Sequence, residues 1–183
     1  MADYLVENYN FKKIAFADGV RDAVEGIFGF TQEQMLDGNT KEKIDPFWGF
    51  SPRYATTNLG ELMKKIHPNV WTIKAFKQID EWIANGENVV VTDMRFFVEY
   101  DGLRERNATL VNVYRPFSIR SHYSKFEIAQ YKYFGHLIWT KKHVSETQLD
   151  DRINDFDHFI WNDEEGNLPR LYDQVEELIH LIS

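Results

Sequence analysis

An acid and a base follow a run of three valines near the middle of the chain. The stretch VVVTDMRFFVEY places Asp93 and Arg95 directly after Val89–Val91. In an open parallel sheet, ligands bind beyond the carboxyl ends of the strands. A carboxylate there can hold Mg²⁺ through water, and an arginine can bind phosphate. The alternative is structural: Asp93 caps the next helix, and Arg95 pairs with Glu99 four residues later.

A second group combines cations with aromatic rings in a loop that precedes a helix. Guanidinium groups bind phosphate and flat rings stack on bases, so this combination suits a nucleotide. The alternative is a surface loop whose aromatic side chains are buried in the core, and the sequence leaves both readings open. The residues concerned are Lys41, Lys43, Phe47, Trp48, Phe50 and Arg53.

A third group is a basic segment within an acidic chain. Residues 115–146 hold six lysines and arginines against two acids, whereas the whole chain has a net charge of −8. This contrast indicates a lid or arm that covers an anionic ligand. An aromatic, basic surface for single-stranded nucleic acid and a solvated excursion are the alternatives.

Composition excludes several other kinds of site. The chain has no cysteine, so disulfides, thiolate catalysis and cysteine zinc sites are ruled out. It contains no GxSxG, HExxH or GxxxxGK[ST] motif, and its six histidines are scattered. The acidic balance argues against a general nucleic-acid binder. We find neither a signal peptide nor an apolar run long enough to span a bilayer, and therefore expect a cytoplasmic protein with no membrane partner.

The elements that position these residues alternate between helices and strands. This order predicts an α/β fold in which a parallel, doubly wound sheet is flanked by helices, in one domain over residues 1–183. A long irregular loop is expected over 31–52. Helices are expected over 2–9, 19–28, 53–66, 71–84 and 171–182, with a helix end over 103–107; strands are expected over 13–17, 89–91, 109–114 and 158–161.

The chain resembles the bacteriophage deoxynucleoside monophosphate kinases of the P-loop kinase superfamily. The similarity is carried by seven short stretches that occur in the same order along nearly the whole chain. None is strong alone, and the order makes the set moderately specific. They are KIAFADGVRDAV, KEKIDPFWGFSPRYATTNLG, IHPNVW, VVVTDMRFFVEYDGLRE, VNVYRP, HVSE and the late ND-x-x-GNL-x-x-L pattern.

The resemblance implies phosphoryl transfer from ATP, with magnesium, to a deoxynucleoside monophosphate (dNMP). Such a reaction depends mainly on positioning and on neutralising charge, which arginines provide. The resemblance assigns Asp93, Arg95 and Arg115 to catalysis, Asp93 also to magnesium directly or through water. It assigns Arg53, Lys41, Trp48, Trp71, Arg21 and Glu99 to the substrate, and Arg120, His143, Ser145 and Glu146 to the lid or its support.

One departure from the family concerns the donor. The family has a strand and a glycine-rich P-loop before the helix that here reads ADYLVENYNF, and neither occurs in this chain. Because the P-loop cradles the donor phosphates, we expect ATP to bind only where such a loop is supplied. The expected fold is therefore P-loop-kinase-like, without the first strand and with residues 115–146 as a basic, lid-like insertion.

Three functions remain open on these grounds. The first is a dNMP kinase whose sequence starts after its P-loop, in the cytoplasm of a phage-infected bacterium. The second is a kinase-derived nucleotide-binding protein that acts as a sponge, a sensor or a partner subunit. The third is an interaction module for protein or nucleic acid that uses residues 115–142. The sequence does not decide whether a homodimer forms.

Overall fold

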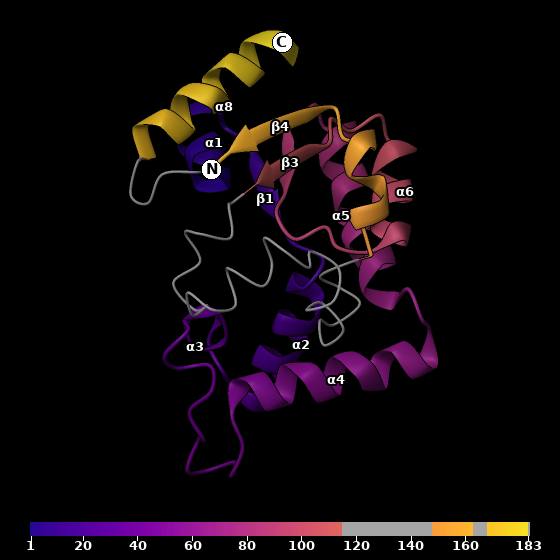
Figure 1. Cartoon of the computed structure of the whole chain (residues 1–183). Helices are drawn as coiled ribbons and strands as arrows, with labels where there is room; N and C mark the ends of the chain where they lie inside the picture. The colour runs from indigo at the N-terminus through magenta and orange to yellow at the C-terminus, as the bar shows by residue number, and fades with distance from the viewer. Residues whose placement is uncertain (115–147, 163–167, 183) are drawn as a thin grey trace, which may run out of the picture. The chain divides into compact units, whose positions relative to one another are not determined.

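The computed structural model describes residues 1–114, 148–162 and 168–182, which belong to two compact units (Figure 1). We call Ala2–Met94 the N-terminal unit and Arg95–Ser183, together with Met1, the C-terminal unit. Each unit contains a two-stranded parallel sheet with helices. The predicted α/β class and the predicted parallel strand direction are confirmed. Within the described residues the strands form these two small sheets, whereas the sequence predicted one doubly wound sheet.

The N-terminal unit follows the predicted order of elements and adds one helix. The unexpected helix, α3, is capped by Thr31, whose hydroxyl accepts the backbone N–H of Gln34, while the Gln34 side chain accepts the N–H of Thr31. We expected residues 31–52 to form an irregular loop, and this prediction is wrong for the part that forms α3. The elements are α1 (Ala2–Tyr9), β1 (Lys12–Ile14), α2 (Asp18–Phe28), α3 (Gln32–Leu36), α4 (Pro52–Ile66), α5 (Val70–Ala84) and β2 (Val89–Val91).

Strands β1 and β2 end side by side. Ile14 is paired with Val91, and the backbone N–H of Thr92 donates to the Ile14 carbonyl at 3.1 Å. The strand predicted over 13–17 is shorter than expected, because residues 15–17 turn into α2 instead of continuing β1. The valines of β2 are half-buried, so the prediction that this strand is covered on both faces is wrong for the described residues.

Glycines with positive φ follow two helices of this unit, and a serine and a proline begin a third. Gly29 has φ +73° after α2, and Gly86 has φ +76° soon after α5. Both angles lie in the left-handed region, where glycine carries no steric cost. Ser51 caps α4 through its side chain, and Pro52 follows at the first helical position, which suits a residue without an N–H.

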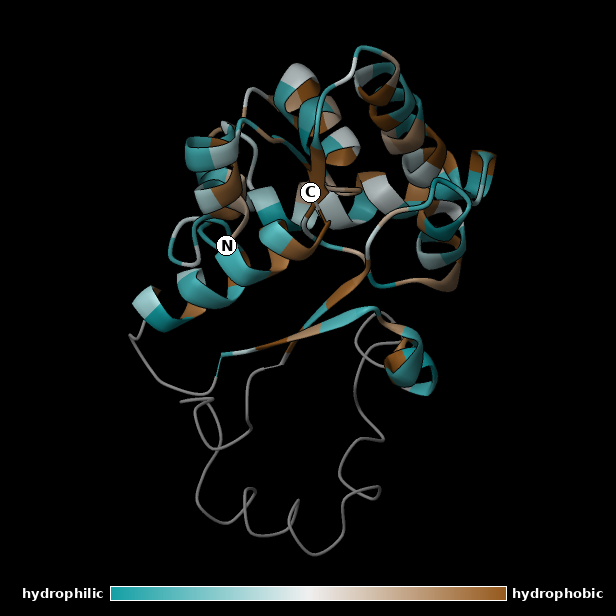
Figure 2. Ribbon diagram, turned by 90° about the horizontal axis from the view of Figure 1, so that it is seen from above, coloured by the Kyte–Doolittle hydropathy of each residue, from teal (hydrophilic) through white to brown (hydrophobic). Residues whose placement is uncertain are grey.

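The core of the N-terminal unit joins α2, α3 and α4. Val24 is completely buried and packs with Phe30, Met35 and Ala55. Figure 2 shows that brown, apolar bands alternate with teal, polar bands along the helices, as expected for elements that bury one face. Glycine permits one close approach here: a Cβ on Gly19 would lie 3.0 Å from the Trp71 ring.

Helix α6 ends where the sequence predicted a helix end. We expected the end of a helix over 103–107, and α6 covers Phe97–Arg104, after which the chain turns through Asn107, whose φ is +56°. A 3₁₀ helix, η4, was not predicted. The elements are α6 (Phe97–Arg104), β3 (Val111–Tyr114), η4 (Asp150–Asp155), β4 (His158–Trp161) and α8 (Leu168–Ile182).

Helix α8 closes one edge of the second sheet. Strand β3 pairs in parallel with β4, with Val111 opposite His158. The side chain of Gln174 accepts the N–H of Trp161 at 2.9 Å and donates to its carbonyl at 3.0 Å, as a neighbouring strand would. The buried face of α8 consists of Leu171, Val175 and Ile179. Among the described residues, every helix is too short or too polar to cross a membrane.

Candidate functional site

The turn between β1 and α2 is held by carboxylates. The backbone N–H of Ala15 donates to Asp18 Oδ2 at 2.6 Å. The next two N–H groups, of Phe16 and Ala17, donate to Asp93 Oδ1 and Oδ2 at 2.7 and 3.1 Å. Asp93 reaches them because parallel pairing brings the carboxyl ends of β1 and β2 together. The structural alternative was half right: Asp93 supports a helix start, but that of α2, not that of the next helix along the chain.

Arg21 extends this turn into α2. Its Nη2 pairs with Asp18 Oδ1, and its side chain is 17% exposed. The guanidinium Nε is buried and has no hydrogen-bond partner within the part of the chain that the structure describes. An unsatisfied buried donor is uncommon in proteins and marks a position worth testing. The assignment of Arg21 to the substrate stays a prediction.

The loop from Asp37 to Ser51 is ordered by two aspartates. Asp37 accepts the N–H groups of Asn39 and Thr40, and a hydrogen bond from the Thr40 side chain is the main cause that lowers the pKa of the Asp37 carboxyl. Asp45 Oδ1 accepts the N–H groups of Phe47 and Trp48 at 2.9 and 3.0 Å. Such turns fix the loop locally.

The aromatic side chains of this loop divide between core and surface. Phe50 packs on the core, with its ring centroid 5.3 Å from that of Phe28. The Trp48 indole N–H donates to the Phe28 carbonyl at 2.9 Å, although the residue remains 39% exposed. Phe47 lies against Trp48, with 4.9 Å between ring centroids, and is 83% exposed. The reading in which the aromatic side chains are buried in the core holds for Phe50, and the nucleotide-site reading stays a prediction.

Two cations of the loop lie close along the backbone. The N–H of Arg53 donates to the Lys41 carbonyl at 2.9 Å, so the start of α4 is tied to the loop. The Arg53 guanidinium makes one ion pair, from Nε to Glu42 Oε1 at 3.2 Å, and both side chains are more than half exposed. Its Nη groups donate to none of the described residues. Arg53 can therefore bind an anion without leaving a buried partner.

Trp71 in α5 packs against α2 and α4. Its indole N–H donates to the Gly60 carbonyl in α4 at 3.2 Å, and its ring lies against Gly19 in α2. These contacts connect three helices of the N-terminal unit. They give Trp71 a packing role, and its assignment to the substrate stays a prediction.

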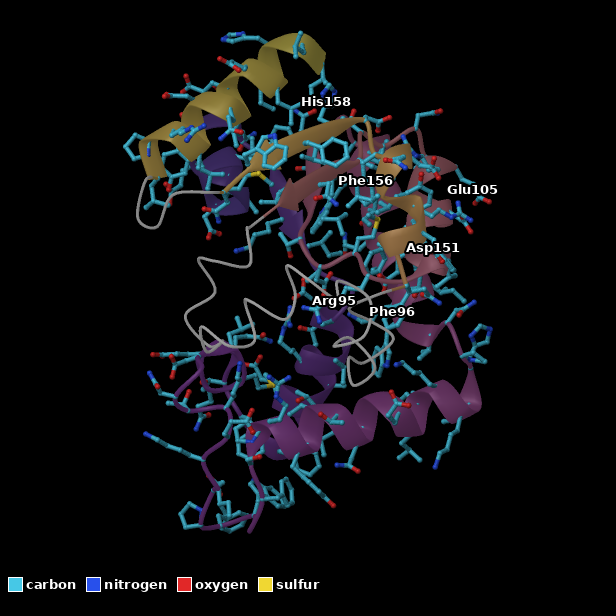
Figure 3. The ribbon with its side chains drawn as sticks, viewed as in Figure 1. Arg95, Phe96, Glu105, Asp151, Phe156 and His158 are labelled. Carbon is cyan, nitrogen blue, oxygen red and sulfur yellow. The ribbon has the colours of Figure 1, made fainter. Side chains whose placement is uncertain are left out.

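In the C-terminal unit, Glu99 holds the residues that lead into α6. Glu99 is 5% exposed, and its Oε2 accepts the N–H groups of Arg95 and Phe96 at 2.7 and 3.0 Å. Figure 3 shows Arg95 and Phe96 next to one another just before this helix. The alternative that Arg95 pairs with Glu99 is correct for the backbone of Arg95. The guanidinium itself is exposed and has no ion pair among the described residues.

A separate network of the C-terminal unit was missed by the sequence analysis. Arg104 Nη1 donates to both carboxylate oxygens of Asp157 at 2.8 and 2.6 Å. Asp157 lies between Phe156 and His158, which Figure 3 labels, and its Oδ2 accepts the N–H of Leu110 at 2.7 Å. The hydrogen bond from Arg104 lowers the pKa of Asp157, and the same bond raises that of Arg104. The two residues are 53 positions apart, so no local pattern joins them.

The remaining predicted residues and the metal complete the picture. Within the described ranges, no three histidines or acids lie together in a way that could hold a metal ion. Asp93 accepts one N–H on each of its oxygens, and its assignment to magnesium, directly or through water, stays a prediction. The residues Arg115, Arg120, His143, Ser145 and Glu146 lie outside the described residues.

The comparisons with known proteins give one weak relationship. No protein-family model matches the chain, and no solved structure gives a significant match. A protein of Acanthamoeba polyphaga mimivirus named "Putative deoxynucleotide monophosphate kinase" is 26% identical over 161 residues. The similarity covers 79% of this chain and 83% of that protein. At this identity the relationship is compatible with a kinase-like function and gives weak support for a phosphotransferase.

Proposed function

We propose that the chain binds a dNMP as a phosphoryl acceptor and transfers to it the γ-phosphoryl group of ATP. The observation that carries the proposal is the loop before α4, which presents Lys41 and Arg53 together with the exposed rings of Phe47 and Trp48. A cation with free donors suits the phosphate, and a flat ring suits the base. The mimivirus relative points in the same direction.

The proposed reaction needs little covalent chemistry from the protein. A phosphate oxygen of the dNMP attacks the γ-phosphorus of ATP, the bond from that phosphorus to the bridging oxygen breaks, and ADP leaves. Arg53 neutralises the acceptor phosphate, and Lys41 and Trp48 shape its surroundings. The family resemblance assigns Arg95 and Arg115 to catalysis. Magnesium, when bound with ATP, neutralises the donor phosphates.

Binding without transfer is the second candidate. It is favoured by one observation, because the 183 residues contain no GxxxxGK[ST] motif for the donor phosphates. In that case the chain keeps the acceptor site and acts as a sponge, a sensor or a partner subunit.

A coupled assay of this chain with ATP, Mg²⁺ and each of the four dNMPs separates the candidates. Formation of ADP that depends on a dNMP supports the kinase, and loss of that activity in Arg53→Ala ties it to the proposed site. If no ADP forms but calorimetry detects a dNMP and not ATP, the second candidate holds. Equal, weak responses to dNMP and ATP contradict both.

A further inference from the structure

The Asp93 carboxylate connects the end of β2 to the turn that follows β1. Its two oxygens accept the N–H groups of two successive residues, Phe16 and Ala17, which lie 77 and 76 positions earlier in the sequence. Charge-assisted hydrogen bonds to a carboxylate are about twice as strong as neutral ones. Asp93 therefore fixes the turn after β1 from the neighbouring strand.

The position of this β1–α2 turn determines where Arg21 lies. The Ala17 carbonyl accepts the N–H of Arg21 at 3.2 Å, and the Ala15 carbonyl accepts that of Asp18 at 3.0 Å. Asp18 then accepts from Ala15 on one oxygen and from the Arg21 guanidinium on the other. Asp93 and the Asp18–Arg21 pair thus hold consecutive residues of the same turn, Ala15 to Ala17, and are joined through its backbone.

A role for Asp93 as a direct magnesium ligand fits this geometry poorly. Protein-bound Mg²⁺ is held by one or two carboxylates in near-ideal octahedral geometry. Here each oxygen of Asp93 accepts one N–H and each oxygen of the neighbouring Asp18 accepts one donor, so a Mg²⁺ ion would have to share these oxygens with the turn. Within the described part of the chain, these acids form no cluster suited to a metal ion.

We infer that Asp93 is a positioning residue, which holds the β1–α2 turn and through it orients Arg21 toward the acceptor nucleotide. This inference rests on the proposed function only in the last step, because the assignment of Arg21 to the substrate comes from the family resemblance. The contacts of Asp93 and Arg21 with the turn do not depend on that assignment.

The test measures binding of dAMP, dCMP, dGMP and dTMP by calorimetry, once in EDTA and once in excess Mg²⁺. Asp93→Asn removes the charge and turns one acceptor oxygen into a donor, so the dissociation constant should rise about tenfold, equally in both buffers. Asp22→Asn is the matched control, because Asp22 lies next to Arg21 in α2 and pairs with Lys74 in α5 instead of with the turn. It should leave the dissociation constant unchanged.

A double-variant cycle tests whether Asp93 acts through Arg21. In an Arg21→Gln background, Asp93→Asn should cause little further loss, because residues that act as one unit are not additive. Full additivity overturns the inference. An effect of Asp93→Asn that occurs only with Mg²⁺ also overturns it, because that result marks a metal ligand. Asp93→Glu keeps a carboxylate but displaces it, so the positioning role predicts a loss similar to that of Asp93→Asn.

Hydrogen exchange separates failure of the inference from failure of the proposed function. In Asp93→Asn the amides of Phe16 and Ala17 and the Arg21 Nε–H should exchange at least tenfold faster, while the Val24 amide keeps its rate. If the wild-type chain binds none of the four nucleotides, the proposed function is wrong, and these exchange rates alone decide the positioning role. Unchanged rates at Phe16, Ala17 and Arg21 contradict it.

Discussion

Arg104 and Arg53 are both paired with an acid, yet the two arginines are held in very different ways. Arg104 in the C-terminal unit makes two hydrogen bonds to Asp157, one to the Asp155 carbonyl and one to the Tyr100 hydroxyl, and it lies over the Tyr100 ring. The Arg53 guanidinium in the N-terminal unit has, among the described residues, one contact, of 3.2 Å, with the exposed Glu42.

This difference separates a structural guanidinium from one that is available to a ligand. A guanidinium has five N–H donors in a fixed planar arrangement. Nearly all those of Arg104 donate to acceptors of its own unit. Among the described residues, the Arg53 guanidinium donates only from Nε, to Glu42. Glu42 is exposed and remains solvated when this ion pair breaks. We therefore expect Arg104 to determine stability and Arg53 to determine nucleotide binding.

The largest expected effect is on binding at Arg53. Arg53→Ala should raise the dissociation constant for a dNMP about 10- to 100-fold, because a charge-assisted phosphate contact is lost. The free energy of unfolding should change by less than about 0.5 kcal/mol, since the pair is exposed. Calorimetry and urea unfolding measure the two quantities.

Glu42→Gln is the control for this variant. It removes the same ion pair and leaves the cation, so nucleotide binding should stay constant or become tighter. A loss of binding in Glu42→Gln as large as in Arg53→Ala would show that the ion pair, and not the free guanidinium, matters.

The reverse pattern is expected for the Arg104 network. Asp157→Ala leaves the N–H of Leu110 and the Nη1 group of Arg104 without their acceptor. The free energy of unfolding should fall by about 1–2 kcal/mol, a value reduced because the pair is about one-third exposed. Urea unfolding checks this value, and calorimetry should find nucleotide binding by the folded variant unchanged. A variant as stable as wild type would refute the structural role of the network.

The same carboxylate gives a smaller effect that depends on pH. Arg104 holds the pKa of Asp157 below its ordinary value of 3.8, so the folded protein keeps the ionised form to lower pH than the unfolded chain does. The contribution of Asp157 to stability is therefore complete above that value and is lost as the pH falls through the depressed pKa. Urea midpoints from pH 6 down to pH 3 should fall less steeply in Asp157→Asn than in wild type. Parallel curves would contradict this assignment.

The smallest effect is expected for Phe47. Its ring is 83% exposed, so Phe47→Ala should change the free energy of unfolding by less than about 0.5 kcal/mol. Trp48→Phe instead loses the hydrogen bond to the Phe28 carbonyl and should cost about 1 kcal/mol. Thermal unfolding of the two variants compares them directly. Equal losses would contradict the expected contribution of the Trp48 hydrogen bond.

Local patterns in the sequence predicted much of this fold. Helices α2, α4, α5 and α8 follow from apolar residues at helical spacing, and the valine run correctly indicated a parallel strand with Asp93 at its end. Helix α3 was missed although a readable signal existed, because Thr31 and Gln34 have the spacing of a capping box. The end of α6 was predicted over 103–107, whereas its start at Phe97 was not predicted, since that start depends on the buried Glu99.

The candidate site was less accessible from sequence than the fold. The sequence singled out Asp93 and Arg53, but the partners of Asp93 lie some 77 positions away, and the acid that pairs with Arg104 lies 53 positions away. Contacts at such separations depend on how strands and helices meet and leave no local pattern. The spacing of Asp18 and Arg21, three apart on one helix face, was the one signal that could have indicated their pairing.

Calorimetric titration of the chain with each dNMP and with the matching deoxynucleoside tests the central claim most directly. The two ligands differ only in the phosphate, so the comparison isolates the group that Arg53 is proposed to bind. We predict that at least one dNMP binds, that its nucleoside binds much more weakly, and that Arg53→Ala removes the difference. Equal binding of nucleotide and nucleoside, or no binding of either, would contradict the proposal.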